Sequence, residues 1–182
     1  ITKIEGLDNC TSLRTLCLNE NCIREVAGLS ALRDLRVLNL SNNFISDLSG
    51  LDGCCPLLEV LHLAANQLSD ESAAVLAKFN YLSVLDISSN KFAAEETIDL
   101  LQQIQTLKVL YIHRNPLVSR MQNYRRKLIM KLQHLSFLDE HPVKDEDRLI
   151  AAAFFEGGLQ KEKEEREKIN KQKHDKRLQC IR

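Results

Sequence analysis

Apolar side chains recur over the first 117 residues in a spacing that fits neither a continuous helix nor a long strand. The spacing runs from Leu13 to Ile23 as Leu-x-x-Leu-x-Leu-x-x-Asn-x-Ile, and four further copies follow in register. Successive copies lie 22, 23, 24 and 25 residues apart, measured between their central leucines. Five copies of one pattern are typical of a solenoid, in which each unit buries its apolar residues against its neighbours. The central leucines are Leu16, Leu38, Leu61, Leu85 and Leu110.

The Leu-x-Leu pair predicts a short strand whose alternate side chains enter the core. A 22-residue unit leaves room only for a tight 3₁₀ return, whereas the longer units can hold α-helix over 70–78 and 94–102. Acidic residues in the first turn of both segments favour a helix start. We therefore expect an α/β solenoid. It would be a leucine-rich repeat horseshoe with a parallel concave sheet, a 3₁₀ and α convex side, a C-terminal cap and a charged helical tail.

One asparagine recurs among the apolar residues of every copy. A buried amide in the turn can bond backbone groups that leave the strand ladder, so we interpret this column as structural. A ligand role is the weaker alternative. The column consists of Asn21, Asn43, Asn66, Asn90 and Asn115.

The order of these segments predicts three parts. Residues 1–117 hold the repeats, and the first repeat is expected to be truncated because Ile1-x-x-Ile4-x-Gly6-Leu7 matches the second half of later copies. Residues 118–142 are expected to form a C-terminal repeat cap, with an amphipathic helix over 124–132 and a last strand-like unit ending at Leu138 and Asp139. Residues 143–182 are expected to be a cap-docking segment followed by a charged helical tail.

The final segment has its own composition. Leu149, Ile150, Ala153 and Phe154 form an apolar stripe at helical spacing that is expected to dock on the cap, and Gly157-Gly158 should break the helix. Residues 160–182 carry nine basic and five acidic side chains, with opposite charges at i,i+4. We expect a solvated helix leaving the domain. A partner-binding or coiled-coil segment is the alternative, although Ile169, Leu178 and Ile181 are too sparse for heptads.

Charge and cysteine patterns exclude several classes of function. The 25 basic and 25 acidic residues balance, which gives no global electrostatic reason to bind nucleic acid or an anionic membrane. No apolar run is long enough to span a bilayer. The six cysteines contain no C-x-x-C pair and are expected to be reduced, mostly buried thiols, so no metal is predicted. No glycine-rich phosphate loop occurs, and no cofactor is expected.

Strand alternation identifies the side chains on the concave face. His62 and Asp86 should lie on neighbouring strands, where they could share a hydrogen bond. Cys17 would be two strands from His62, roughly 10 Å away, so a nucleophilic set fails on geometry and no catalytic residue is predicted. The valines can form an apolar stripe or merely pack across their strands, and Tyr and Arg are common interface hot spots. The predicted protein-binding surface is Val37, Val60, Val84, Val109, His62, Asp86, Tyr111, His113 and Arg114.

The repeat consensus and cap resemble an intracellular leucine-rich repeat family that includes a phosphatase-1 regulatory subunit, a spliceosomal subunit and an axonemal dynein light chain. Residues 138–143 (Leu-Asp-Glu-His-Pro-Val), Asp147-Arg148, the segment 152–155, Gly157-Gly158 and residues 162–166 (Glu-Lys-Glu-Glu-Arg) resemble the leucine-rich-repeat dynein axonemal assembly factors more specifically. His141 and Phe154-Phe155 depart from that pattern, where the family tends to have Arg and Trp.

This resemblance implies a non-enzymatic cytoplasmic protein, associated with cilia or flagella. It would act as a monomeric scaffold in the preassembly of axonemal dynein arms, with dynein subunits and chaperone or co-chaperone components as partners. Two alternatives are an axonemal dynein light-chain-like attachment protein and a phosphatase-1 regulatory protein. The latter should carry more acidic and aromatic residues on the concave face, where only Glu20, Asp86 and Tyr111 fit that description.

Overall fold

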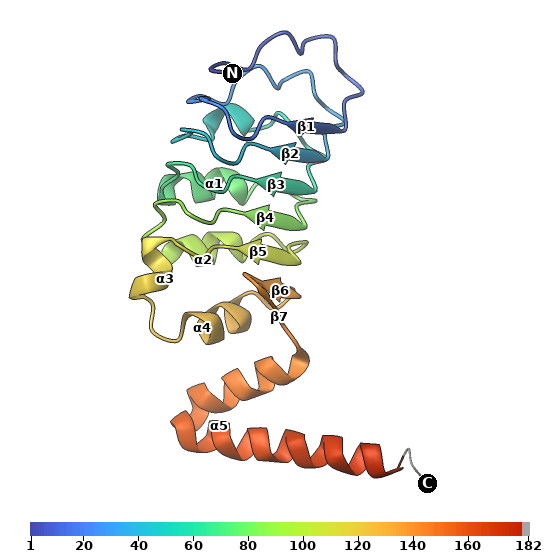
Figure 1. Ribbon diagram of the computed structural model, residues 1–182, viewed down its shortest axis with the longest axis vertical. Coiled ribbons are helices and arrows are strands. Elements are labelled where there is room, and N and C mark those ends of the chain that lie inside the picture. The colour runs from blue at the N-terminus through green and yellow to red at the C-terminus, as the bar shows by residue number, and fades with distance from the viewer. Residues whose placement is uncertain (180–182) are drawn as a thin grey trace.

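The strands stack in sequence order along one curved sheet. The computed structural model describes residues 1–179, and its sheet has seven strands in the order β1 to β7 (Figure 1). The repeat strands pair in parallel and have three residues each. They are β1 (Thr15–Cys17), β2 (Val37–Asn39), β3 (Val60–His62), β4 (Val84–Asp86) and β5 (Val109–Tyr111). The predicted solenoid with a parallel sheet is confirmed.

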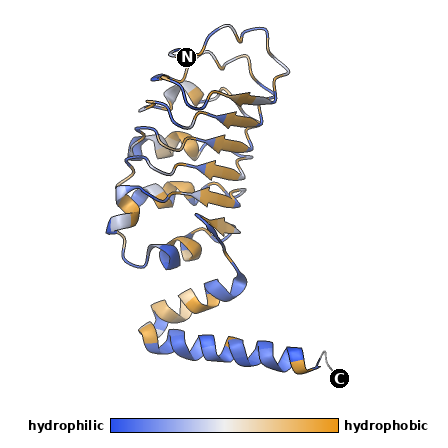
Figure 2. Ribbon diagram, viewed as in Figure 1, coloured by the Kyte–Doolittle hydropathy of each residue, from blue (hydrophilic) through white to orange (hydrophobic). Residues whose placement is uncertain are grey.

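The core consists of the repeated leucines. The register places each central leucine opposite the next, and Leu38, Leu61, Leu85 and Leu110 are fully buried. Figure 2 shows the strands in the colour of apolar residues, in contrast to the hydrophilic end of the chain. Leu16 lies on β1, which has a strand neighbour on one side, and is only half-buried. Burial of the stack therefore depends on neighbouring repeats, as in other solenoids.

The convex side holds short helical returns. The segments are η1 (Ser49–Leu51), η2 (Asp70–Ser72), α1 (Ala73–Leu76) and α2 (Glu96–Leu101). The α-helices occur in the longer repeats, as expected, but they are shorter than the predicted 70–78 and 94–102, because the chain must return to the sheet within one repeat. The Asp70 carboxylate accepts hydrogen bonds from the N–H groups of Ala93 and Ala94 at 3.0 and 3.1 Å, which joins two repeats.

The cap follows the fifth repeat. It contains α3 (Pro116–Arg120), α4 (Tyr124–Lys131) and two short strands, β6 (Phe137–Leu138) and β7 (His141–Pro142), which pair antiparallel. Two arginines secure it by donating to backbone carbonyls. Arg125 donates to Leu138 O and Pro142 O at 3.2 and 2.8 Å, and Arg148 donates to Leu135 O at 2.6 Å and also to Ile129 O. The helix predicted over 124–132 is therefore present, and the sheet ends at this cap.

The last helix, α5 (Asp145–Gln179), reverses direction halfway along its length. Gly157 and Gly158 have non-helical backbone angles, and Gly158 has φ 68° and ψ −156°, a region that only glycine occupies readily. Residues 159–179, here called the returning half, run back beneath residues 145–156 (Figure 1). The predicted break at the glycines and the solvated, charged helix after it are present, but this helix first runs back along residues 145–156 and does not leave the domain directly.

Two buried side chains explain why the returning half packs back. Glu162 is 5% exposed and accepts two hydrogen bonds from Arg126 Nη2, at 2.9 and 2.8 Å, and one from Arg166 Nη2 at 2.8 Å. Ile169 is 7% exposed. Lys173 pairs with Glu146 at 2.5 Å across the two halves. Sequence spacing could find the i,i+4 pair Glu162–Arg166 but could not find the partner that lies 36 residues away.

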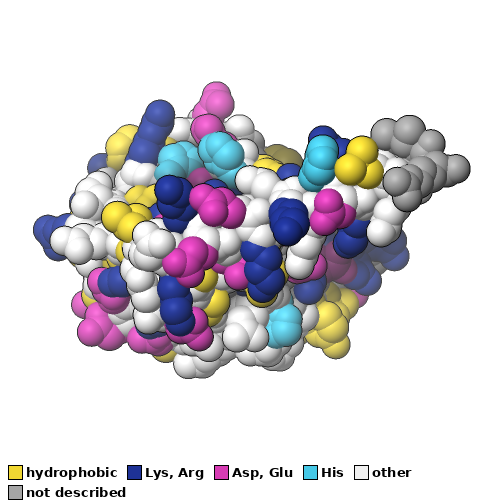
Figure 3. All heavy atoms as spheres, turned by 90° about the horizontal axis from the view of Figure 1, so that it is seen from below, with side chains coloured by type: hydrophobic (Ala, Val, Ile, Leu, Met, Phe, Trp, Pro, Cys, Tyr) yellow, Lys and Arg dark blue, Asp and Glu magenta, His cyan; other side chains and the backbone are white. Residues whose placement is uncertain are grey.

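The docking stripe is correct for three of its four residues. Ile150, Ala153 and Phe154 are half-buried, whereas Leu149 is 53% exposed and Ala151, which was not predicted, is fully buried. Figure 3 looks onto this end of the molecule and shows positive and negative side chains interspersed over its surface.

No helix within residues 1–179 is long and apolar enough to cross a membrane.

The expectation of mostly buried thiols is wrong. Cys10, Cys17 and Cys22 are exposed because they lie on turns or on the open face of the first strand, while Cys55 is buried. Burial raises the pKa of the Cys55 thiol to about 11, so it stays protonated. Cys180 and Ile181 lie outside the described residues.

Candidate protein-binding surface

The concave face is built from residues that alternate with the buried leucines. The register aligns one apolar row across the sheet and a second, mostly polar row beside it. The apolar row consists of Thr15, Val37, Val60, Val84, Val109 and Phe137. The second row consists of Cys17, Asn39, His62, Asp86 and Tyr111. All four valines are half-buried, so they pack across the strands and still present part of their surface.

Tyr111, His113 and Arg114 lie at the C-terminal end of this face. The Tyr111 ring packs against Phe137 with centroids 6.0 Å apart, which fixes its position. His113 is half-buried, and its Nδ1 lies 3.4 Å from Asp139 Oδ1, a contact that becomes an ion pair when the ring is protonated. Arg114 is exposed. The structure thus brings an aromatic ring, an imidazole and a guanidinium together beside the valine row.

Asp139 directly follows β6 and was not predicted as a functional residue. Its Oδ1 accepts the N–H groups of Ile112 and His113, just after β5, at 2.8 and 3.0 Å, and so continues the contact between the two strands. Its Oδ2 accepts the Tyr124 hydroxyl at 3.1 Å. Burial and the nearby carboxylate raise the pKa of Tyr124, which therefore remains a donor. The only available signal was the Leu138-Asp139 pair in the cap motif.

The asparagine column forms a hydrogen-bond ladder between repeats. Asn66 donates to Leu40 O of the preceding repeat at 3.0 Å and accepts the Ile45 N–H, also at 3.0 Å. Asn43, Asn90 and Asn115 are buried and make equivalent bonds. Asn21 is partly exposed and bonds the Ile1 amino group instead. These amides occupy backbone groups at the turn where each strand ends.

The residue before each of these asparagines has a left-handed backbone. Glu20, Asn42, Ala65, Ser89 and Arg114 have φ between 53° and 58°. Non-glycine residues rarely adopt this conformation, and the repeated bonds from the adjacent asparagine hold the turn in place. The turn sets the direction in which the Arg114 side chain leaves the sheet.

The expected His62–Asp86 hydrogen bond is not formed. The two residues are neighbours in the register, but Asp86 Oδ1 accepts the Ser88 N–H at 3.0 Å and the Ser88 hydroxyl at 2.7 Å. Cys17 pairs with Asn39, not with His62. Within residues 1–179, no three His, Cys, Asp or Glu side chains are placed to hold a metal ion. The surface offers apolar contact and isolated polar groups, which suits binding of another protein.

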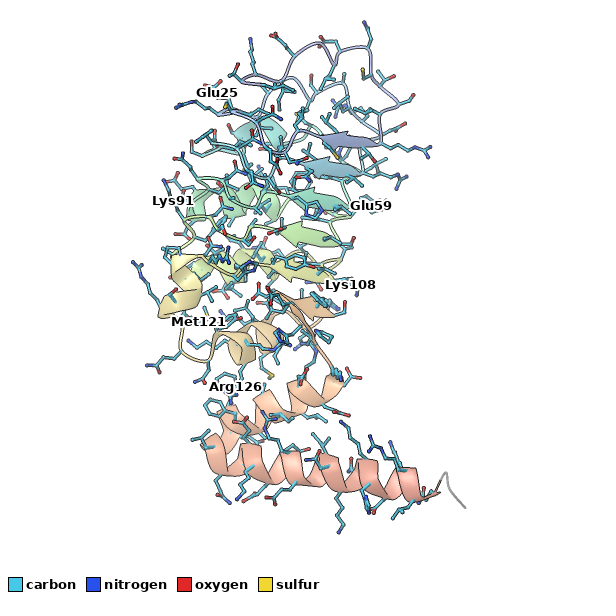
Figure 4. The ribbon with its side chains drawn as sticks, viewed as in Figure 1. Glu25, Glu59, Lys91, Lys108, Met121 and Arg126 are labelled. Atoms are coloured by element: carbon cyan, nitrogen blue, oxygen red, sulfur yellow. The ribbon has the colours of Figure 1, made fainter. Side chains whose placement is uncertain are left out.

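An edge row of charges flanks the start of the strands. Figure 4 labels Glu59 and Lys108 there, at the edge opposite Glu25 and Lys91. Arg36 forms an ion pair with Glu59 on the neighbouring repeat. Lys108 is exposed, so the edge of the valine row carries an available positive charge.

Comparisons with known proteins agree with this architecture. Residues 11–53 and 33–77 each match the family described as "Leucine Rich repeats (2 copies)". Among solved structures, the Drosophila melanogaster SNF/U2A' complex gives a TM-score of 0.66 at 24% identity, covering 84% of this chain and 87% of that one. A Listeria monocytogenes internalin gives 0.59 at 20% identity, covering 80% and 47%. The chain has the fold of a leucine-rich repeat solenoid.

Known relatives of similar sequence include dynein axonemal assembly factors. The chain is 39% identical over 112 residues to the leucine-rich repeat-containing protein ODA7 of Chlamydomonas reinhardtii, covering 58% of this chain and 26% of the relative. It is 42% identical over 86 residues to human dynein axonemal assembly factor 1, covering 47% and 12%. For the Drosophila yakuba homologue of that factor the identity is 36% over 127 residues, covering 69% and 8%. The predicted resemblance is confirmed, and the chain spans about a quarter or less of these relatives.

Proposed function

We propose that this chain is a protein-binding scaffold, without catalytic activity, that serves in the cytoplasmic preassembly of axonemal dynein arms. Its partners would be dynein subunits and chaperone or co-chaperone components, and it would act as a monomer in cells that build cilia or flagella. The observation that carries the assembly role is the 35–42% identity to dynein axonemal assembly factor 1 proteins and ODA7. The open concave sheet supports the scaffold role.

The concave face is the proposed docking site. It combines the valine row with His62, Asp86, Tyr111, His113 and Arg114. Aromatic and arginine side chains contribute much of the binding energy in protein interfaces, and Tyr111 is already held in place by Phe137. Little ordering of this side chain is needed when a partner binds, which favours affinity.

Affinity capture from the cytosol of flagellated cells tests the assembly role, with residues 1–182 as bait and mass spectrometry as the readout. We expect dynein arm chains together with chaperone components. Recovery of phosphatase catalytic subunits from this cytosol would contradict the assembly role. So would a parallel capture from axonemes that recovers a dynein motor domain, if the cytosol yields no dynein arm chains. Each result favours one of the alternatives. A matched bait carrying Val84→Glu on the concave face should lose the same partners. A bait carrying Lys78→Glu, on the convex side, should retain them.

A further inference from the structure

The reversal of α5 creates a groove on the cap that is separate from the concave face. The groove lies between α4 and the two halves of α5, and its volume is about 310 Å³. Half of its lining residues are apolar or aromatic: Tyr124 and Ile150 are half-buried, and Met121, Ile129 and Ala151 are buried. Figure 4 labels Met121 and Arg126 on this part of the molecule. A concavity of this size lies at the lower end of the range for ligand sites and fits one or two large side chains.

Arg166 forms part of the groove wall, so the groove depends on the returning half. This half is held by the buried Glu162, which bonds Arg126 and Arg166, and by Ile169. The Arg126 guanidinium also lies over the Phe154 ring, 4.4 Å from its centroid. Gly157 and Gly158 have non-helical backbone angles, and the turn that they make brings Arg166 to the groove.

Three arginines and one carboxylate, Asp147, line the groove. Arg125 donates to two backbone carbonyls and Arg126 pairs with the buried Glu162, so both of these guanidinium groups are already engaged. Arg166 gives Nε and Nη2 to Glu162, while its Nη1 donates to no group among residues 1–179. Its side chain is 56% exposed. A guanidinium with free donors beside apolar side chains is suited to bind a carboxylate next to an apolar side chain.

We propose that this groove binds a short peptide segment of a partner protein, in which a large apolar side chain is adjacent to an Asp or Glu. The apolar side chain enters between Ile129 and Ile150, and the carboxylate pairs with Arg166. Charge complementarity favours an acidic segment, since the exposed Arg166 keeps Nη1 as a donor. This site goes beyond the concave docking face and would give the scaffold a second contact on its cap.

The test uses the full chain and a phage-displayed library of random eight-residue peptides. We expect enriched peptides to pair a large apolar residue with an adjacent acid. As synthetic peptides, they should bind at least tenfold more weakly to Ile150→Glu and about fivefold more weakly to Arg166→Gln. Replacing the Asp or Glu of the peptide by Asn or Gln should weaken its binding to the wild-type protein about fivefold. The same replacement should not weaken its binding to Arg166→Gln any further. Circular dichroism melts establish whether each variant is folded. If Ile150→Glu is unfolded, Arg166→Gln alone tests the proposal.

Two matched variants serve as controls. Lys171→Gln changes an exposed cation on the same half of α5, and Val84→Glu changes the concave face; both should leave peptide affinity unchanged. Failure to enrich any peptide, enrichment of peptides without acids, or affinity unaffected by Arg166→Gln would overturn the proposal. Affinity lost in Val84→Glu but kept in Ile150→Glu would assign the peptides to the concave face and likewise overturn it.

Discussion

Replacing Asn66 by alanine tests the ladder that joins the repeats. The amide of Asn66 donates to Leu40 O, Leu63 O and Ala64 O and accepts the Ile45 N–H. All three carbonyls keep a partner without it, because Leu40 O also accepts from Asn43, Leu63 O from Asn90 and Ala64 O from the Asn42 N–H. The buried Ile45 N–H loses its partner. We therefore expect Asn66→Ala to lower the free energy of unfolding by about 1–3 kcal/mol, the cost of one unsatisfied buried group.

Asn21→Ala is the matched control in the same column. Asn21 is partly exposed, its carbonyl oxygen bonds the exposed Ile1 amino group, and Leu18 O retains Asn43 as a donor. This substitution should cost less than about 0.5 kcal/mol, as is usual for exposed positions. Asn66→Asp keeps an acceptor for Ile45 but turns a carboxylate oxygen toward Leu40 O, so it should destabilise more than alanine does.

Urea unfolding followed by circular dichroism measures these differences, and an unchanged m-value shows that the same surface is exposed on unfolding. Equal effects of Asn66→Ala and Asn21→Ala would refute the reasoning. So would a change below about 0.5 kcal/mol for Asn66→Ala, since the unsatisfied Ile45 N–H would then have another partner.

Three further predictions concern the surface and the tail. Replacing Tyr111, His113 and Arg114 together by alanine should abolish capture of partners while leaving the melting temperature within a few degrees, and unchanged capture would remove these residues from the docking site. Deleting residues 160–182 should leave the repeats folded, because among residues 1–179 no hydrogen bond or ion pair joins the returning half to residues 1–117. Loss of cooperative unfolding in a thermal melt would contradict this. The hydrogen bond from Arg126 lowers the pKa of Glu162, so its contribution to stability is present above the pKa of an unfolded glutamate, about 4.3, and is lost as the pH falls through the lower folded value. The protection factors of the amides in residues 159–179 against hydrogen exchange should fall across that acidic window in the wild type, and Glu162→Gln should show low protection already at neutral pH.

Much of the fold could be predicted because a solenoid is governed by local repetition. Each Leu-x-Leu pair meets the equivalent pair of the next copy, so one register places all the central leucines in the core and the valine row on the concave face. The same repetition placed Tyr111, His113 and Arg114 at one end of that face. The cap helix near residue 124 and the break at Gly157-Gly158 could also be predicted, because amphipathic spacing and glycine pairs are local features of the sequence.

Only the tertiary structure decided the contacts between segments that lie outside the repeat pattern. The direction of the returning half depends on the Glu162–Arg126 contact across 36 residues, and the attachment of the cap to β5 uses one carboxylate, Asp139, that bonds two N–H groups after that strand. Asp86 and His62 could share a hydrogen bond by their place in the sheet, but Asp86 bonds the N–H and hydroxyl of Ser88, two residues along its own chain. Sequence by itself determined which residues share a face; burial and charge pairing in three dimensions decided which of them bind one another.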